Sequence, residues 1–329
     1  MPTAPANNGN PATNMNALNY ATEYGRALSQ KFPYVLNFGK LYSTPNNGRY
    51  RWVNAKTIEI PSISTTGRVN ANRDSISLAQ RNYDNSWEPK TLTNERKWST
   101  LVHPKDIDQT NMVTTIANIT QVFNEEHKFP EMDAYCVSKI YQDWLTTTDT
   151  DTGVSHTPDT TILTKDNILS VFDNLMLNMD NRRVPANGRI LYVTHEVKTL
   201  LKEAAGISRS MDITSGPNAI DRRVNRLEEV EIIGVPATLM RTLYNFTVDW
   251  QIAAGAGQIN MMLIHPLAVI TPVSYEFSKL DAPSAGSEGK YIYYEESFED
   301  VFILNKKSDA IQFNITAGSG TTGSTTTTG

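Results

Sequence analysis

Residues 129–145, FPEMDAYCVSKIYQDWL, carry the clearest helix signal in the chain. Pro130 suits the first turn of a helix, and Glu131 and Asp133 place negative charge near the positive helix start. Apolar residues then recur at steps of three and four, as one face of a helix requires. The predicted apolar stripe consists of Met132, Cys136, Ile140 and Trp144, widened by Val137 and Tyr141. This pattern predicts a long helix that begins at Pro130 and has one buried side.

Further helices and strands are expected in blocks around this helix. A third helix should start from about Thr164, a plausible N-cap. An earlier helix after His103 should use the stripe Met112, Ile116, Ile119 and Phe123. Strands are predicted at 190–193, 230–233, 238–241, 261–264 and 269–275, with a helix at 196–204 and a final strand pair within 291–305. Because strands and helices come in blocks rather than in strict alternation, we predict an α+β fold.

The chain ahead of these helices, residues 40–103, reads mainly as strands. A hairpin turn is predicted at Asn46, Asn47 and Gly48, because Asn and Gly tolerate positive φ. One parity of the next strand carries Tyr50, Trp52, Ile58 and Ile60. Residues 64–100 hold few large apolar side chains, and a lone hairpin is marginal in water. We therefore expect a two-stranded flap that leans on another chain, and predict that deleting 66–96 leaves a folded subunit that cannot assemble.

Composition excludes several classes of protein. The formal net charge of −5 gives no global basic field of the kind that marks nucleic-acid readers. Cys136 is the single cysteine, so no intrachain disulfide is possible. No apolar run approaches the roughly 20 residues of a membrane span, and the first residues lack the features of a secretory signal. We expect an intracellular protein with a flexible arm at 1–16 and a flexible Gly/Ser/Thr tail at 317–329.

No catalytic, cofactor-binding or metal-binding residue is predicted, and no enzymatic activity. The histidines are scattered without metal-ligand spacing, at positions His103, His127, His156, His195 and His265. The DTDTG run at 149–153 hints at a calcium loop, but the twelfth loop position, which needs a Glu, is Thr160. The AAGAGQ run at 253–258 is interpreted as a turn, and Cys136 as a core thiol.

One acidic group remains as a weak metal candidate. It consists of Glu125, Glu126, His127, Glu131 and Asp133. These residues stand where one predicted helix ends and the next begins, a place where acids stabilise the helix dipole. The preferred interpretation is therefore a helix boundary rather than a metal site.

Five segments, in this order, resemble the major capsid proteins of tailed bacteriophages. They are FPEMDAYCVSKIY (129–141), RVPANGRILYVTHEVKTLLKEA (183–204), IIGVPATLMRT (232–242), INMMLIHPLAVITPVSYEFSKL (259–280) and YIYYEESFEDVFILNKKSDAIQF (291–313). The resemblance spans about residues 34–313. It implies the Hong Kong 97-like fold, in which residues 129–145 would begin the spine helix.

The resemblance also implies a division of the chain. The expected parts are an N-terminal arm (1–40), an E-loop (41–103), a peripheral domain with the spine helix (104–185), an axial domain (186–268), a return to the peripheral domain (269–315) and a tail (316–329). Some members of the family crosslink chains through a Lys and an Asn. The lysines of the E-loop region are Lys56, Lys90 and Lys97, and none can be assigned such a role from the sequence.

The function implied by the resemblance is a major capsid protein. Such a chain self-assembles as pentamers and hexamers into a closed icosahedral shell around double-stranded DNA, without reading its sequence. The expected location is the virion, after synthesis in the bacterial cytoplasm. A separate scaffold protein, or none, is expected; portal and decoration proteins are further candidate partners, and no membrane is expected. Two alternatives stay open: an encapsulin-like compartment that holds enzymes, and an unrelated surface or tail adhesin suggested by the Thr-rich end.

Overall fold

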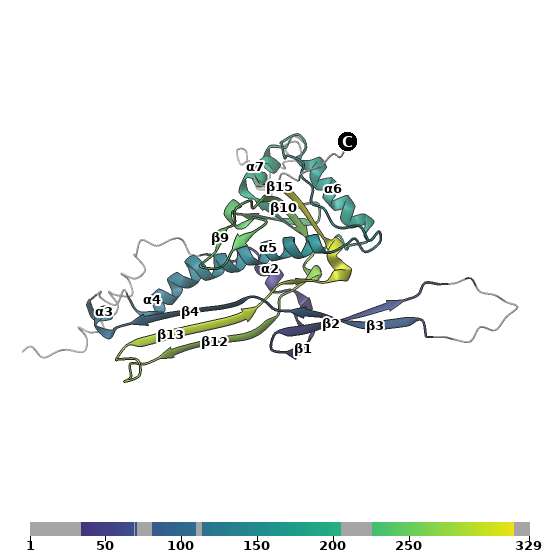
Figure 1. The fold of residues 1–329 in the computed structure, drawn as a ribbon. Helices are drawn as coiled ribbons and strands as arrows, with labels where there is room; N and C mark the ends of the chain where they lie inside the picture. The colour runs from purple at the N-terminus through teal and green to yellow at the C-terminus, as the bar shows by residue number, and fades with distance from the viewer. Residues whose placement is uncertain (1–33, 69, 71–80, 110–113, 205–225, 319–329) are drawn as a thin grey trace, which may run out of the picture.

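The computed structural model describes residues 34–68, 70, 81–109, 114–204 and 226–318. Figure 1 shows a long molecule in which a three-stranded sheet and a hairpin extend in opposite directions from a common base. A compact body of sheet and helices stands on that base. The mixture of helices and strands agrees with the predicted class. The predicted arm at 1–16 and most of the predicted tail lie outside the described residues.

A five-stranded sheet with the order β15-β10-β5-β7-β6 forms the centre of the body. The β5–β7 pair is parallel, and the other three pairs are antiparallel. Strand β5, Ile190–Thr194, is buried along its whole length, as its unbroken apolar run indicates. The other strands are β6 (Arg226–Leu227), β7 (Val230–Val235), β10 (Gln258–Ile264) and β15 (Ile311–Thr316). The strands predicted at 190–193, 230–233 and 261–264 are confirmed.

Successive residues of β5 point to opposite faces of the sheet and so divide the core in two. Leu191 belongs to the cluster covered by α6 (Ile168–Asn181) and α7 (His195–Glu203). Tyr192 belongs to the opposite cluster, which α5 (Phe129–Thr146) covers. The body therefore has three layers, with the sheet between two layers of helix.

Helix α5 confirms the helix predicted from Pro130. It continues α4 (Ile116–Phe123) through a π-helical segment (Asn124–Lys128), so the helical run is unbroken from 116 to 146. Its buried apolar residues include Ala134, Cys136, Val137, Ile140, Tyr141 and Trp144. Met132 is only half-buried, and the adjacent Asp133 is the residue fully removed from solvent. The earlier predicted helix appears as α3 (Pro104–Gln109) and α4, and Met112 lies outside the described residues.

A three-stranded antiparallel sheet lies beneath this helical run (Figure 1). Its order is β12-β13-β4, with bounds Val273–Asp281, Tyr291–Glu299 and Glu95–Val102. Trp98 of β4 stacks on Phe123 at the end of α4, with ring centroids 3.9 Å apart. Arg96 binds Glu131 of α5 through both carboxylate oxygens. One face of the sheet is thus covered by helix.

The hairpin consists of β2 (Thr57–Thr65) and β3 (Tyr83–Thr91), paired antiparallel from Thr57↔Thr91 to Thr65↔Tyr83. Strand β1 (Arg51–Asn54) pairs with the base of β2. Ile58 of β2 and Leu92, which directly follows β3, are buried in a small cluster with residues of the body. The outer part of both strands is exposed on nearly every residue. The predicted two-stranded flap is confirmed as a hairpin.

Short elements join these layers. They are α2 (Gly39–Tyr42), η1 (Pro45–Gly48), η3 (Ala237–Leu239), β8 (Tyr244–Asn245), β9 (Gln251–Ile252), η4 (Pro266–Ala268), β11 (Val269–Ile270), β14 (Phe302–Ile303) and η5 (Asn305–Ala310). The strand predicted at 269–275 is divided into β11 and β12, and the final predicted pair appears as β13 and β14. Strand β15 was not among the predicted strands.

One predicted turn and one predicted N-cap are wrong. The segment at Asn46 is a 3-10 turn after α2, because Thr44 caps it and the Asn46 amide donates to Leu267 O at 2.7 Å. The chain reverses instead between β1 and β2, at residues 55 and 56. Thr164 is not the N-cap of α6. Asn167 holds that position and accepts a hydrogen bond from the Thr164 backbone.

The strand predicted at 238–241 is also wrong. The chain forms η3 there, after Pro236. The Tyr244 hydroxyl donates to Thr238 O at 2.7 Å and accepts from Arg241 N at 3.1 Å. A side chain therefore supplies hydrogen bonds that a neighbouring strand would otherwise make.

Candidate interaction surfaces

The acidic group at the start of α5 is not assembled into a metal site. Glu131 binds Arg96, and His127 Nδ1 lies 3.0 Å from Asp249 Oδ2. Asp133 is turned into the core, away from both. Within the described residues, no three His, Cys, Asp or Glu side chains come together as metal ligands would. The predicted helix boundary is also wrong, because α4, the π-helical segment and α5 form one unbroken helical run through these residues.

The DTDTG run forms a turn that is stabilised from within. Asp149 Oδ1 accepts hydrogen bonds from the backbone of Asp151 and Thr152, at 2.9 and 2.8 Å. The same carboxylate forms an ion pair with Arg182. Burial is the largest single influence on the pKa of Asp149 and raises it. The hydrogen bonds and the charge of Arg182 together outweigh burial, so the pKa is lowered. The aspartate is used by the turn and by Arg182, so the local geometry explains it without calcium.

Two histidines are buried and serve packing. His156 stacks on Trp144 with ring centroids 5.0 Å apart, and its Nε2 lies 3.2 Å from Ser308 Oγ. His265 caps η4, because its Nδ1 accepts from Leu267 N at 3.2 Å. Burial lowers the pKa of both imidazoles, which favours their neutral forms. The Ser308 hydroxyl beside His156 is itself fully buried and bonds to the carbonyl oxygens of Thr148 and Asn305, so this pair has a structural role.

The remaining candidates also have structural explanations. Cys136 is fully buried, and burial raises the pKa of its thiol well above the usual range. A thiol held protonated in this way is a weak nucleophile. The AAGAGQ run is a turn, with Gly255 at φ +77°. None of the described helices has the length and apolar character needed to cross a bilayer.

A buried anchor holds the first described residues against α5. Asp133 is 0% exposed and accepts hydrogen bonds from the Tyr34 hydroxyl, the Asn37 backbone at 2.8 Å and the Phe38 backbone at 3.2 Å. Burial raises the pKa of Asp133 even though these bonds act in the opposite direction. From the sequence, Asp133 was expected to act only at the helix start. Its position four residues before Val137 and seven before Ile140, on the apolar face of the helix, was the signal of burial.

Two hydrogen bonds from side chains tie the described part of the hairpin to the body. Lys306 Nζ donates to Ile63 O at 2.8 Å, and Lys90 Nζ donates to Asn305 Oδ1 at 3.0 Å. Within the described residues, no further hydrogen bond joins β2 or β3 to the body. Ser64, for example, bonds to Asp84 O of the opposite strand. The outer hairpin is therefore free to contact something else.

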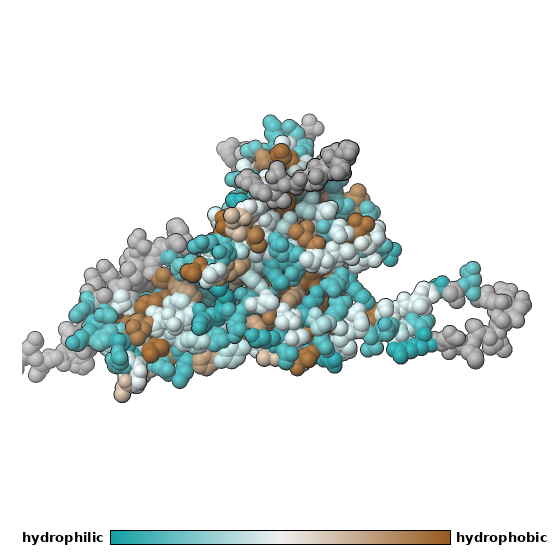
Figure 2. Space-filling model, in the orientation of Figure 1, coloured by the Kyte–Doolittle hydropathy of each residue, from teal (hydrophilic) through white to brown (hydrophobic). Residues whose placement is uncertain are grey.

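Exposed apolar side chains gather on the hairpin sheet and on the three-stranded sheet. On the former they are Trp52, Val53, Ile63, Tyr83 and Trp87, and on the latter Leu101, Val273, Tyr275, Phe277 and Leu280. Figure 2 shows the apolar residues of this view in several small groups rather than in one patch. Tyr275 and Phe277 stack on each other with centroids 6.2 Å apart. Dispersed apolar groups of this kind can serve several contacts with neighbouring chains.

The comparisons with known proteins agree on the fold. No protein-family model matches the chain, and no curated protein matches it. Solved structures do match over most of its length. The capsid structure of cyanophage P-SCSP1u is similar with a TM-score of 0.64 and 14% identity, covering 89% of this chain and 91% of that one.

Two further structures give the same result. The mature capsid of bacteriophage PhiM1 has a TM-score of 0.59 and 15% identity, with coverage of 81% and 83%. The capsid of Helicobacter pylori bacteriophage KHP30 has a TM-score of 0.55 and 11% identity, with coverage of 96% and 99%. At these identities the likeness concerns the fold. The chain has the fold of proteins found in bacteriophage capsid structures.

Proposed function

We propose that this chain is the major capsid protein of a tailed double-stranded DNA bacteriophage. Its copies assemble as pentamers and hexamers into a closed icosahedral shell that encloses the genome. The observation that carries the proposal is the likeness to capsid structures across at least four fifths of both chains. A shell is built from contacts between copies, so no catalytic residue is required.

The proposal gives the described elements roles of the Hong Kong 97-like fold. The hairpin would be the E-loop, α5 the spine helix, and the three-stranded sheet part of the peripheral domain. Strand β4 lies in the 41–103 stretch but pairs with β13, so the E-loop proper would end before Glu95. The central sheet would form most of the axial domain, and it takes β15 from beyond residue 268. The protein would be made in the host cytoplasm and reside in the virion.

The hairpin explains why a shell suits this chain better than a monomer does. Its strands expose the side chains of Ile63, Tyr83 and Trp87 to solvent. A two-stranded ribbon is marginal by itself, so a neighbouring copy would stabilise it. Contacts between unlike surfaces close into a shell when the rotation between copies allows it.

Electron microscopy and sedimentation of the expressed protein test the proposal. We expect closed particles with five-fold and six-fold units, alone or with the natural scaffold and portal proteins. Particles purified from infected cells should contain double-stranded DNA, whereas an encapsulin-like compartment would contain protein cargo. Monomers at every salt concentration, with the partner proteins present, would refute a shell. Soluble trimers that bind a host surface would favour an adhesin.

The interaction with DNA should be non-specific. The net charge of −5 gives the chain no general attraction for phosphate. Scattered lysines and arginines can contact phosphates, which carry no sequence information. Tight, sequence-selective binding of the isolated subunit to a short duplex would contradict this part of the proposal.

A further inference from the structure

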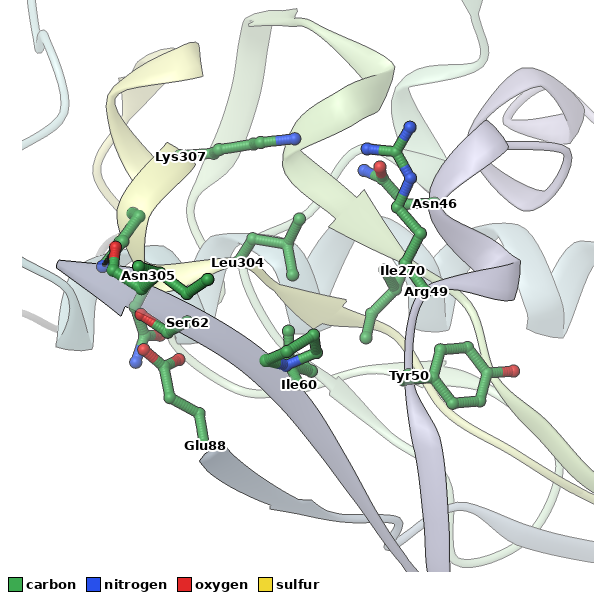
Figure 3. A pocket seen from close by; sticks show the side chains of 13 residues that line it. Asn46, Arg49, Tyr50, Ile60, Ser62, Glu88, Ile270, Leu304, Asn305 and Lys307 are labelled. Carbon is green, nitrogen blue, oxygen red and sulfur yellow. Dashed lines mark hydrogen bonds between the residues drawn. The ribbon is translucent and has the colours of Figure 1, made fainter. Parts of the chain in front are cut away.

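A pocket of about 250 Å³ lies where the hairpin meets the body (Figure 3). Its apolar lining comes from three separate parts of the chain, with Ile60 in β2, Ile270 in β11 and Leu304 just before η5. Three basic residues line it, Arg49, Lys306 and Lys307, and the side chains of Arg49 and Lys307 approach it from opposite sides. The pocket is large enough for one or two side chains, and too small for a nucleotide or another drug-sized ligand.

The two cations are directed toward each other. Figure 3 shows the Lys307 side chain extending from η5 toward the guanidinium of Arg49. Burial, followed by the positive charge of Arg49, lowers the pKa of Lys307. Like charges brought together beside an apolar surface are unfavourable unless an anion lies between them.

The described chain supplies no anion for these cations. No ion pair or side-chain hydrogen bond of Arg49 or Lys307 is found among the described residues, whereas the adjacent Lys306 donates to Ile63 O. Glu88 lines the same pocket but lies on the side of Ser62 and Asn305, away from the two cations. Among the described residues, the positive site therefore has no counter-charge.

We propose that an aspartate or glutamate side chain from a second copy of this chain inserts between Arg49 and Lys307. The inference rests on the proposed function, since a shell brings many copies into contact. A carboxylate accepts two charge-assisted hydrogen bonds there, and an apolar residue next to it fills the lining formed by Ile60 and Leu304. The contact then fixes the angle between the hairpin base and its neighbour.

Charge complementarity favours a second copy as the source. The chain has 35 acidic and 30 basic residues, so a neighbouring copy presents more carboxylates than cations. The pocket is lined by residues of the hairpin, such as Ile60 and Glu88, and of the body, such as Ile270 and Leu304, so it lies where the hairpin joins the body. A contact at this place adds to any contact that the outer hairpin makes.

Zero-length crosslinking of assembled particles tests the proposal. A water-soluble carbodiimide condenses a carboxylate and an amine in direct contact into an amide, with loss of water. Particles are assembled from a mixture of unlabelled and ¹⁵N-labelled chains, treated and digested. We expect a peptide pair in which Lys307 is joined to an Asp or Glu of a chain with the other label. Crosslinks of Lys307 that join only chains of the same label would overturn the proposal.

Three variants complete the test. The double variant Arg49→Glu, Lys307→Glu should lower the particle yield at least about tenfold while the monomer keeps its circular dichroism spectrum. Lys307→Arg keeps the charge, so particles should form but the Lys307 crosslink should disappear. Lys165→Glu, an exposed lysine far from the pocket in sequence, should leave both yield and crosslink unchanged.

The outcomes separate this inference from the proposed function. Normal particles from the double variant, or wild-type particles without the crosslink between chains, would remove the inference and leave the capsid function in place. Failure of the wild-type chain to form particles would remove both. Free phosphate at about physiological concentration is added before crosslinking. An unchanged yield of the Lys307 crosslink would show that the occupant is not a small anion.

Discussion

The body and the hairpin differ in where their aromatic side chains find partners. Trp144 in the body is 1% exposed and packs on Phe313, with ring centroids 5.1 Å apart. Trp87 in the hairpin is 39% exposed, and its ring is covered only by Arg51 of the same small sheet, at 3.8 Å. The body is complete in one copy. The hairpin has side chains suited to a contact and no partner for them within the described chain.

This difference predicts that substitutions in the two regions separate stability from assembly. In the body, a lost side chain leaves a cavity in packed surroundings. On the hairpin, exposed ion pairs such as Arg51–Glu59 contribute little to the free energy of unfolding. Substitutions there should affect association of copies far more than folding.

The largest effect on stability is expected from Trp144→Ala. Removing this buried ring should lower the free energy of unfolding by about 3–5 kcal/mol, whereas Trp87→Ala should lower it by less than about 1 kcal/mol. Urea unfolding of the two monomers, followed by circular dichroism, measures both. Equal losses in the two variants would show that the hairpin is part of the folded core.

A smaller effect is expected from Asp133→Ala. The change removes the acceptor for Tyr34, Asn37 and Phe38 and leaves buried donors unpaired, at a cost of about 1–3 kcal/mol. Limited proteolysis should cut the chain near Tyr34 faster in the variant. The matched control is Asp173→Ala on the exposed side of α6, which should change neither quantity. Unchanged proteolysis in Asp133→Ala would show that the anchor does not hold this segment.

The pH dependence of stability should come partly from His156. Burial lowers its folded pKa below the usual value of about 6.5, although the charges of Asp309 and Asp149 act the other way and Arg182 adds to the lowering. As pH falls through 6.5, the unfolded chain binds a proton before the folded chain does. The free energy of unfolding should therefore fall between about pH 7.5 and 5.5, and less so in His156→Gln. A steeper fall in the variant would contradict this assignment.

The smallest effect on the monomer is expected from shortening the hairpin. Ile63 and Asn85 are paired across the strands, so residues 64–84 can be replaced by Asn-Gly, which forms a two-residue turn. The monomer should lose less than about 1 kcal/mol, because the removed part packs on nothing in the described body. Light scattering should show that assembly is lost. Particles at normal yield would mean that the outer hairpin makes no essential contact.

The larger deletion of residues 66–96 is not a clean test, contrary to the prediction from sequence. It removes Leu92, which is 2% exposed in the cluster under the hairpin, and Arg96, which binds Glu131. Deletion of those residues should destabilise the monomer as well. The sequence showed few apolar residues in this stretch, but it could not show that one of them closes a cluster with Phe298 and Phe302.

Sequence patterns predicted the elements whose burial is one-sided or complete. The stripe of α5 and the run Ile190–Thr194 were recognised because their periodicity reflects the core they build. The errors lie where a distant side chain decides the backbone. Asn46 bonds to Leu267, and Tyr244 bonds to Thr238 and Arg241, and no local pattern announces either contact.

The interaction surfaces were predictable only in outline. The shortage of apolar residues at 64–100 indicated a flap, but not where it leaves the body. Arg49 and Lys307 lie 258 positions apart in the sequence, so their proximity could be recognised only in the folded chain. In the sequence, Asp133 resembles an ordinary acid at a helix start. Only the fold brings together the hydrogen-bond donors that bind its buried carboxylate.

Amide hydrogen exchange of β2 and β3, compared between unassembled subunits and particles, tests the central claim most directly. The account predicts that amides around Ile63 and Tyr83 exchange readily in the subunit and become protected on assembly. Amides of β5 should be protected equally in both states, because the body is already complete. Equal exchange of the hairpin in subunits and particles would contradict the claim that the hairpin finds its partner in a neighbouring copy.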